Sequence, residues 1–427
     1  MRTADSNGWW ERLRAEERLV LQLLRDVGAG SVESGLDWDY VYTIAESHKL
    51  VSLVWYLLQR RYPALALPAP AREKFLARVA LEELGDRAQT SLVRQLVQIE
   101  SSLPGPVVFL KGSVLKWRVY PESTLRRSAD VDVLVATAEV EPLRAALEAL
   151  QFNMESPLWP TLEQQRRVFY ELPPMRGSNG QKVDVHWNFT CPGSPYHRDP
   201  ALYLQSVQTV EAAGARLHTL DSEYFLLHMA VHIYTSAKLS FTLRDLYDFH
   251  LVSGHGVVRP FDEERFLGIV HEMHLTDPAY FCCELTGNAL DSPRMRAIAT
   301  RLRSEAGPVA RKHAQRAVAN LHLLMRPYNH YMVMLEDVLA EGRPVAVLKA
   351  LFGIRRGEYE RLYFEPVSSS PAALLVYPKH VVRLLQFYHL GFGLHFERLV
   401  GARIWTDAKA ALGARGGALR SGSRQRT

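Results

Sequence analysis

The sequence predicts an α+β protein in which a small mixed or antiparallel sheet lies between two helical regions. Three observations support this fold class. Over the first hundred residues, apolar side chains recur at spacings of three and four, which is the period of amphipathic helices. Short apolar segments of strand character then lie between residues 106 and 220. After Asp221, a good N-cap residue, the helical spacing returns.

The N-terminal helical region covers residues 1–105. Periodic apolar positions predict helices at residues 9–27 and 40–60. A proline cluster at residues 63–70 separates these from a long helix expected at residues 72–103. The Pro-Gly-Pro sequence that follows ends this helix immediately before the first strand of the sheet.

The α/β core is expected at residues 106–220. Its predicted later elements are a strand at 131–135, a helix at 140–150, and strands at 167–172 and 182–189. The Gly-Ser-Asn-Gly sequence between the last two strands has the chemistry of a hairpin turn. We therefore expect an antiparallel or mixed sheet with helices on one side.

The C-terminal helical region is expected at residues 221–412, with its first two helices at 222–234 and 242–252. A late aromatic and basic segment, residues 377–400, has an amphipathic pattern. Helix packing is the default interpretation of this segment, and docking to a membrane surface or a partner is the alternative. The Gly-, Ser- and Arg-rich residues 413–427 are expected to be a disordered basic tail.

The composition is that of an ordinary globular protein. The chain has 427 residues, 47% of them hydrophobic and 23% charged, which is enough for two or three domains with a sizeable core. The net charge of +5 is a mild basic excess that lies largely in the tail. A basic tail is weak evidence for nucleic-acid binding, because solvated tails of this kind are common.

The cellular setting predicted by the sequence is the cytoplasm. Three cysteines cannot form a disulfide framework, and the first residues contain no apolar signal segment. No stretch approaches 18 continuous apolar residues, so no transmembrane segment is expected.

Two neighbouring segments carry the most informative pattern in the chain. V-V-F-L-K-G-S-V-L-K-W at residues 107–117 reads as strand, turn and helix, and S-A-D-V-D-V-L-V at residues 128–135 reads as a second strand. Asp130 and Asp132 are two apart in that strand, so their carboxylates project to one face. Two adjacent carboxylates resist burial unless a cation neutralises them. A divalent ion such as Mg²⁺, which binds carboxylates together with substrate phosphates, meets this need.

The turn between strand and helix is suited to a phosphate. Gly112 allows close approach of the backbone, and the helix expected from Val114 presents N–H groups and a dipole that favour an anion. The hydroxyl and N–H of Ser113 could hold a β- or γ-phosphate. Lys111 could neutralise a triphosphate, or could be an ordinary solvated lysine at a strand end.

This arrangement resembles the nucleotidyltransferase superfamily (polymerase-beta-like), whose pattern is strand, Gly-Ser, helix and Asp-x-Asp. It is most similar to an uncharacterised bacterial family with the pattern Lys-Gly-Ser … Asp-x-Asp … Asp-x-His-Trp. The resemblance implies a third acidic residue on a later strand, matched by Asp184 in K-V-D-V-H-W-N-F. An arginine often precedes the paired aspartates in that family, and Arg127 matches it. The interval from Ser113 to Asp130 is longer than in the minimal superfamily pattern, as is usual for this family.

The resemblance implies a transferase that moves a nucleoside monophosphate, with AMP expected, from an NTP to an unidentified hydroxyl or phosphate acceptor, releasing pyrophosphate. Asp130, Asp132 and Asp184 would bind Mg²⁺ or Mn²⁺, with two ions expected, and Asp184 could accept the proton of the acceptor. The acceptor could be a small molecule, a peptide or a protein, and a nucleic acid is only weakly supported. The alternative is a catalytically inactive nucleotide-binding scaffold or regulatory subunit of the same fold.

Other side chains carry less specific patterns. Arg126 and Arg127 could clamp phosphates or be solvated loop charges. His228 and His232 are four apart on an apolar helix, a spacing seen in metal sites, but the acidic neighbour of a zinc protease is missing. We therefore interpret both histidines as polar residues facing the nucleotide cleft or as core residues.

The resemblance adds three further positions around the site. His186 could orient Asp184, contact the substrate, or simply pack beside Trp187. Histidines on the helix of His228 and an Arg-Asp pair on the next helix are also part of the resemblance. Arg244 and Asp245 match that pair, and we interpret them as supporting or interdomain contacts.

Overall fold

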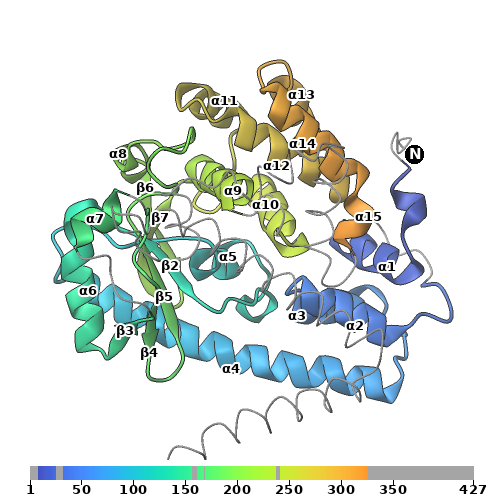
Figure 1. The fold of residues 1–427 in the computed structure, drawn as a ribbon. Helices are drawn as coiled ribbons and strands as arrows, with labels where there is room; N and C mark the ends of the chain where they lie inside the picture. Colours follow the sequence, from blue (N-terminus) through green and yellow to red (C-terminus); the bar gives the residue numbers. More distant parts are fainter. Residues whose placement is uncertain (1–7, 26–31, 156–160, 168, 237–240, 326–427) are drawn as a thin grey trace, which may run out of the picture. The chain divides into compact units, whose positions relative to one another are not determined.

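The computed structural model describes residues 8–25, 32–155, 161–167, 169–236 and 241–325 (Figure 1). The chain divides into two compact units, residues 1–335 and 336–427, and every described element belongs to the first. The late amphipathic segment at 377–400 and the tail at 413–427 therefore lie outside the described residues.

The N-terminal region is helical, as predicted. Its elements are η1 (Trp10–Arg12), α1 (Ala15–Leu24), α2 (Trp38–Ser47), α3 (Val51–Arg61) and α4 (Ala69–Glu100). The 32-residue helix α4 confirms the long helix expected after the proline cluster. It runs across the lower part of the coloured ribbon in Figure 1 and contacts α2, α3, β2 and β7.

The helix predicted at residues 40–60 is interrupted at Lys49, which separates α2 from α3. Lys49 has a left-handed backbone with φ of +59°. The N–H of Leu50 donates to the carbonyl of Ala45 (2.7 Å), and that of Lys49 donates to the carbonyl of Glu46 (3.1 Å). This pair of bonds is the Schellman ending of a helix, which usually places glycine at the left-handed position. Apolar periodicity continues through this turn, so it could not indicate the break.

The core is a seven-stranded mixed sheet within the described residues, which confirms the α+β class. The strands are β1 (Val108–Phe109), β2 (Val131–Leu134), β3 (Phe152–Met154), β4 (Met175–Gly177), β5 (Lys182–His186), β6 (Val207–Ala212) and β7 (Ala215–Leu220). Their order is β3-β4-β5-β2-β1-β7-β6. The pairs β2–β5 and β1–β7 are parallel, and the remaining neighbours are antiparallel.

Short helices connect these strands. They are α5 (Gly112–Arg118), η2 (Ser123–Leu125), η3 (Thr137–Glu139), α6 (Val140–Ala149), α7 (Leu162–Arg166) and α8 (Pro200–Leu204). The turn between β4 and β5 is the predicted hairpin, in which Gly180 has φ of +81° and donates its N–H to the carbonyl of Gly177 (2.9 Å). The positive φ explains the glycine at this position.

The prediction of a strand at residues 167–172 was wrong in its position. In the described part of this segment only an isolated bridge between Glu171 and His186 forms, and the strand that pairs with β5 in the antiparallel hairpin is β4. Pro173 and Pro174 lie between them and have no N–H to donate to a sheet. The prediction also missed β3, β6 and β7, whose polar, half-exposed sequences give a weak apolar pattern.

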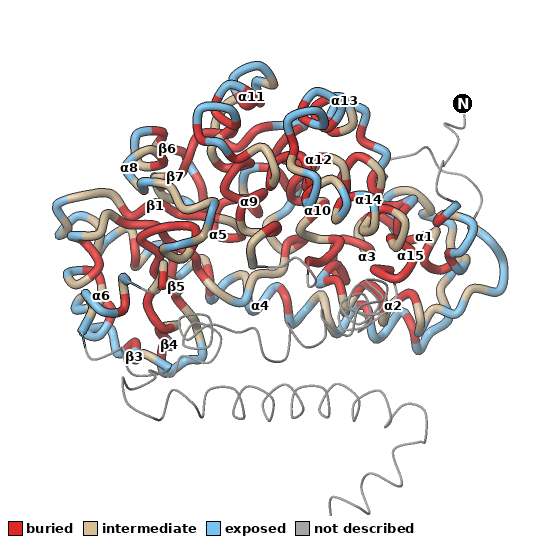
Figure 2. Tube along the Cα trace, turned by 45° about the horizontal axis from the view of Figure 1, so that its top comes forward, coloured by how far each residue is buried: buried red, intermediate tan, exposed pale blue. Residues whose placement is uncertain are grey.

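After the sheet the described chain is again helical. The helices are α9 (Ser222–Ser236), α10 (Leu243–His255), α11 (Glu263–Glu272), α12 (Thr276–Ala289), α13 (Pro293–Leu302), α14 (Pro308–Ala319) and α15 (Leu321–Leu324). Asp221 caps α9 as predicted, accepting a hydrogen bond from the N–H of Tyr224 (3.0 Å). Buried residues run through the sheet and through α9 and its neighbours (Figure 2). None of the helices described has the length and apolar character needed to cross a membrane.

Candidate active site

A cavity of about 380 Å³ lies where the ends of β1, β2 and β5 meet the helices α9 and α10. Most of the residues singled out in the sequence line it, together with several that were not. The charged and histidine residues that line it are Lys49, Lys111, Arg126, Asp130, Asp132, Glu171, Asp184, His186, His232, Arg244, Asp245 and Asp248. The cavity is therefore an ionic site with carboxylates and cations in close proximity.

The three predicted aspartates come together in this cavity. Asp132 and Asp184 are direct register partners on the parallel strands β2 and β5. Paired residues of adjacent strands project to the same face of a sheet, so their carboxylates share one side. Asp130 immediately precedes β2 and lines the same cavity. The register of two strands thus unites residues that are 52 positions apart in the sequence.

Asp132 is held by two positively charged groups. Its Oδ1 lies 2.8 Å from Nζ of Lys111 and 3.1 Å from Nε2 of His186. Burial alone would raise the pKa of Asp132, but Lys111 and His186 hold it well below its usual value. The Asp132 carboxylate is therefore ionised and fixed in position.

Asp184 is less completely satisfied than Asp132. Its Oδ2 lies 3.0 Å from Nζ of Lys182. Its Oδ1 is buried and has no hydrogen-bond partner among the described residues. Burial and the charge of Asp132 raise the pKa of Asp184 to about 6. An unpartnered carboxylate oxygen inside a cavity is a group that a ligand can satisfy.

His186 connects two carboxylates. Its Nδ1 lies 3.0 Å from Oε2 of Glu171, and its Nε2 faces Asp132. Burial opposes protonation, but Glu171 and Asp132 together raise the pKa of His186 to about 9. The ring of Tyr170 stacks on the imidazole, with centroids 5.8 Å apart. His186 is thus a buried cation that donates from both ring nitrogens.

Glu171 was missed by the sequence analysis, although it carries a signal in hindsight. It is the one carboxylate in the apolar stretch between Val168 and Leu172. The apolar pattern of this stretch predicts a strand, and a single glutamate within it belongs to no motif. Lys182, the partner of Asp184, was missed because a lysine at the start of a strand is usually solvated.

The Gly112 turn is closely covered by the chain itself. A Cβ on Gly112 would overlap Nη1 of Arg126 and Oγ of Ser128, so a larger residue would have to displace these two side chains. The Ser113 hydroxyl is fully buried and donates to the carbonyls of Leu110 and Asp132. Gly112 lines the cavity with Lys111, whereas Ser113 lies behind it.

Arg126 is one half of a buried ion pair. Its Nη2 lies 2.6 Å from Oδ2 of Asp248, and its Nε also donates to that carboxylate (3.0 Å). The hydroxyl of Tyr120 donates to Oδ1 of Asp248 (2.6 Å). These contacts leave the Nη1 edge of the guanidinium directed at Gly112 and the cavity.

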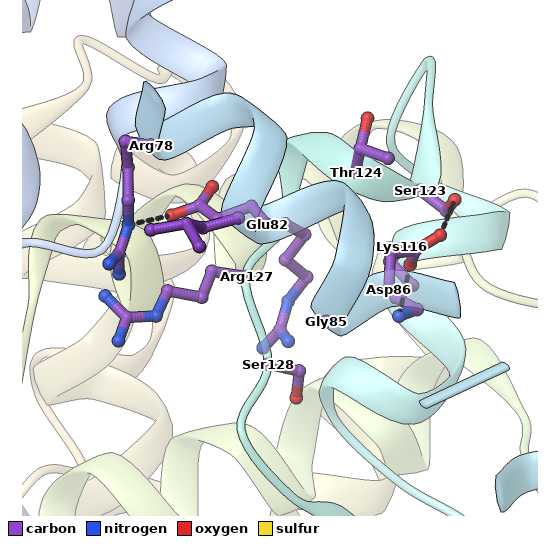
Figure 3. A pocket seen from close by; sticks show the side chains of 11 residues that line it. Arg78, Glu82, Gly85, Asp86, Lys116, Ser123, Thr124, Arg127 and Ser128 are labelled. Carbon is purple, nitrogen blue, oxygen red and sulfur yellow. Dashed lines mark hydrogen bonds and ion pairs between the residues drawn. The ribbon is translucent and has the colours of Figure 1, made fainter. Parts of the chain in front are cut away.

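Arg127 lines a second, smaller cavity of about 150 Å³ (Figure 3), which shares Arg126 and Ser128 with the first. In Figure 3 its guanidinium lies beside that of Arg78. Oε1 of Glu46, which the figure does not draw, lies 3.3 Å from Nη1 of Arg127 and 3.2 Å from Nη2 of Arg78. Lys116, also in this cavity, pairs with Asp86 at 2.5 Å. The cations of this cavity are thus paired with the chain's own carboxylates.

The two predicted histidines of α9 differ in their surroundings. His228 is buried, its ring lies 4.0 Å from that of Phe189, and neither ring nitrogen has a hydrogen-bond partner among the described residues. Burial and the charge of Lys111 lower its pKa well below the usual value. His232 lines the cavity, and the same causes lower its pKa to about 3. Both are therefore neutral at physiological pH.

Arg244 and Asp245 stand at the start of α10. Nη1 of Arg244 donates to the carbonyl of Arg127 (2.9 Å), and its Nε is buried without a partner among the described residues. Asp245 forms a capping box with Thr242, accepting the backbone N–H (2.8 Å) and the hydroxyl (2.9 Å). Both residues line the cavity with the aspartates.

The carboxylates fit a divalent cation in their chemistry. Within the described ranges, no group of three or more His, Cys, Asp or Glu is arranged to hold an ion. A lysine pairs with each of Asp132 and Asp184. Oxygen donors of this kind are nevertheless those that Mg²⁺ prefers, and Oδ1 of Asp184 is a buried oxygen without a partner in the described chain. The donor set therefore suits Mg²⁺ or Mn²⁺ rather than a thiolate-binding metal.

Comparison with known proteins gives a family match over most of the described chain. Residues 34–291 match the model of a family described as uncharacterised nucleotidyltransferase. No curated protein matches the chain. Among solved structures, the solution structure of the antibiotic-resistance factor ANT(2'')-Ia matches with 12% identity and a TM-score of 0.31. The match covers 54% of this chain and 98% of that one.

Proposed function

The chain belongs to the family of uncharacterised nucleotidyltransferases, and from this premise we propose that it transfers a nucleoside monophosphate from an NTP to an acceptor. AMP is the expected nucleotide, the acceptor group is a hydroxyl or a phosphate, and pyrophosphate is the leaving group. The observation that carries the proposal is the register pair Asp132–Asp184, which lines one cavity with Asp130 and several cations.

Asp130, Asp132 and Asp184 would hold Mg²⁺ or Mn²⁺, with two ions expected. Bound divalent ions supply neutralisation of phosphate charge and lower the pKa of an acceptor hydroxyl. Lys111 and Lys182 neutralise two of these carboxylates in the free protein. Each ammonium has three donors, so each can also bind a phosphate oxygen of the substrate.

Other side chains of the cavity would orient the aspartates and the substrate phosphates and would activate the acceptor. His186 fixes Asp132 through Nε2, and Glu171 fixes His186 through Nδ1. Asp184 is the candidate general base, because its Oδ1 is free of described partners and can take the acceptor proton. Arg126, held by Asp248, presents a guanidinium edge to the substrate phosphates.

The acceptor is proposed to be a small molecule, a peptide or a protein in the cytoplasm, where NTPs are available. A nucleic-acid acceptor has the weaker support, since the net charge of +5 is modest. If the acceptor is an RNA, the protein should bind it with an affinity that falls steeply as the salt concentration rises.

The direct test is pyrophosphate release by the purified full-length protein with each NTP, in Mg²⁺, in Mn²⁺ and in EDTA. NTP labelled at the α-phosphate, supplied with fractionated cell extract, identifies the fraction that retains label. Asp184→Asn should abolish labelling, whereas the exposed control Glu163→Gln should not, because Arg167 is the one described residue that pairs with Glu163. Labelling by Asp184→Asn at the wild-type rate would refute the proposed reaction.

The alternative of an inactive nucleotide-binding scaffold is favoured by one observation, the engagement of Asp132 by Lys111 and His186. Calorimetry distinguishes the two. NTP binding that is independent of metal, with no pyrophosphate released in any fraction, would favour the scaffold. Metal-dependent binding with labelled product favours the enzyme.

A further inference from the structure

The cavity that holds the aspartates also contains three cations that come from three separate parts of the chain. Lys49 lies in the turn between α2 and α3, Arg126 lies in the loop before β2, and Arg244 lies in the first turn of α10. None of these parts belongs to the strands that carry the carboxylates. The N-terminal helical region therefore contributes a charged side chain directly to the site.

Lys49 occupies an unusual position for a lysine. It is the left-handed residue of the Schellman turn, where glycine or asparagine is the residue expected from backbone energetics. Its side chain is exposed at the cavity and forms no ion pair or hydrogen bond with any described residue. A strained backbone that presents an unpaired cation to a cavity is characteristic of a functional position.

The three cationic segments are joined to one another by hydrogen bonds. The N–H of Leu243 at the start of α10 donates to Nδ1 of His48, the residue before Lys49 (3.2 Å). Arg244 donates to the carbonyl of Arg127 (2.9 Å), and Arg127 pairs with Glu46 of α2 (3.3 Å). These contacts link α2, the loop before β2 and α10 in a closed ring, so the positions of their cations are set by the fold.

The cations are incompletely neutralised by the chain. Arg244 pairs with Asp245 through Nη2 (3.3 Å), but its Nε is buried without a described hydrogen-bond partner. Arg126 directs its Nη1 edge to the cavity while its other edge binds Asp248. Desolvation by the surrounding chain and the nearby charge of Arg244 lower the pKa of Lys49. Like charges that are gathered in this way repel each other, and a bound polyanion relieves the repulsion.

We propose that Lys49, Arg126 and Arg244 form the binding site for the phosphate chain of the nucleotide, so that the N-terminal helical region is part of the nucleotide site. This inference rests on the proposed function. A polyphosphate is favoured over an acceptor anion because the same cavity holds the aspartates proposed to act at the α-phosphate. Several charges on one ligand also match three cations better than a single carboxylate does.

The test is calorimetric binding of ATP, inorganic pyrophosphate and adenosine to the full chain in Mg²⁺. Lys49→Asn removes the charge and keeps a residue that tolerates the left-handed backbone, and Lys49→Arg keeps the charge. Lys74→Asn is the matched control, because Lys74 is an exposed lysine of the same region that pairs with Asp39. Arg244→Gln tests the second cation, and melting temperatures establish that each variant is folded.

We expect Lys49→Asn and Arg244→Gln to bind ATP and pyrophosphate about tenfold or more weakly, as for loss of one charge-assisted contact. Lys49→Arg and Lys74→Asn should bind both within about twofold of the wild type, and adenosine binding should not change. Unchanged ATP and pyrophosphate binding by Lys49→Asn would overturn this inference and leave the proposed function intact. Equal weakening of adenosine binding would also overturn it, because the effect would not be on phosphate. A wild-type protein that binds neither ATP nor pyrophosphate would overturn the proposed function itself.

Discussion

Asp132 and Asp184 lie at the same register position of the parallel strands β2 and β5, and each carboxylate contacts a lysine of its own, Lys111 and Lys182. This pairing explains how two buried acids coexist on one face of a sheet. Each ammonium offsets one carboxylate, and the offset is incomplete at Oδ1 of Asp184. The site thus contains charged groups and a carboxylate oxygen without a described hydrogen-bond partner before any ligand binds.

Asp184→Asn is expected to reduce nucleotidyl transfer by about a thousandfold or more, because it removes both a proposed ion ligand and the candidate base. The fold should be retained, since asparagine has the same shape and the side chain has one described contact, with Lys182. Initial rates of pyrophosphate release and a thermal melt measure the two effects. If Asp184→Asn lost its fold together with its activity, the result would assign Asp184 a structural role instead of a catalytic one.

Glu171→Gln is expected to raise the Mg²⁺ concentration needed for half-maximal rate by about 10- to 100-fold, because it removes a partner that orients a proposed metal ligand. Glutamine cannot hold Nδ1 of His186 as a carboxylate does, so His186 no longer fixes Asp132. The measurement is the Mg²⁺ concentration for half-maximal rate. Glu171→Asp should recover part of the loss, whereas an unaltered Mg²⁺ dependence in Glu171→Gln would exclude the orienting role.

Gly112→Ala should destabilise the protein by about 1–3 kcal/mol, because the new methyl would overlap Nη1 of Arg126 and Oγ of Ser128. Gly85→Ala is the matched control in α4, where a Cβ meets nothing within 4 Å. The control should stabilise by up to about 1 kcal/mol, as expected for alanine in a helix. Urea denaturation measures both, and equal effects of the two substitutions would contradict the close packing at Gly112.

Asp248→Asn should lower the free energy of unfolding by about 3–5 kcal/mol, since it leaves the buried guanidinium of Arg126 without its counter-ion. The hydroxyl of Tyr120 would lose a charged acceptor at the same time. Denaturant unfolding of the wild type and the variant gives the difference. A change below about 1 kcal/mol would mean that solvent reaches and stabilises Arg126.

Asp245 should make stability depend on pH in the acid range. Burial opposes its ionisation, but Arg244 and the backbone of Thr242 lower its pKa from 3.8 to about 2. The folded state thus binds its proton less readily than the unfolded state. The contribution, about 2 kcal/mol, is complete above pH 4 and is lost as pH falls from about 4 to 2. Acid titration followed by circular dichroism should show a weaker pH dependence in Asp245→Asn over this window.

Much of this fold could be predicted because its signals are local. The N-cap at Asp221, the long helix α4 and the hairpin turn at Gly180 each follow from a few neighbouring residues. The strand expected at 167–172 did not form as predicted, and the break at Lys49 was missed. Their causes are a following pair of prolines and a turn that uses lysine where glycine is usual.

The candidate site could be predicted only in part from the sequence. Asp130, Asp132 and Asp184 could be singled out because aspartates stand out in apolar strands. The role of Glu171 depends on its contact with His186. The role of Lys49 depends on the cavity that residues distant in the sequence form around it. Arg127 shows the converse, since its motif position favours a nucleotide contact, whereas in the fold it lines a neighbouring cavity and pairs with Glu46.

The buried pair of Arg126 and Asp248 has a consequence for how the polypeptide can be divided. The two residues are separated by 122 positions, so a nascent chain presents the arginine long before its counter-ion has been synthesised. Any expression fragment that stops short of α10 would carry that guanidinium permanently uncompensated beside the glycine bend. Truncations intended for crystallisation should therefore extend beyond His255, the last residue of α10.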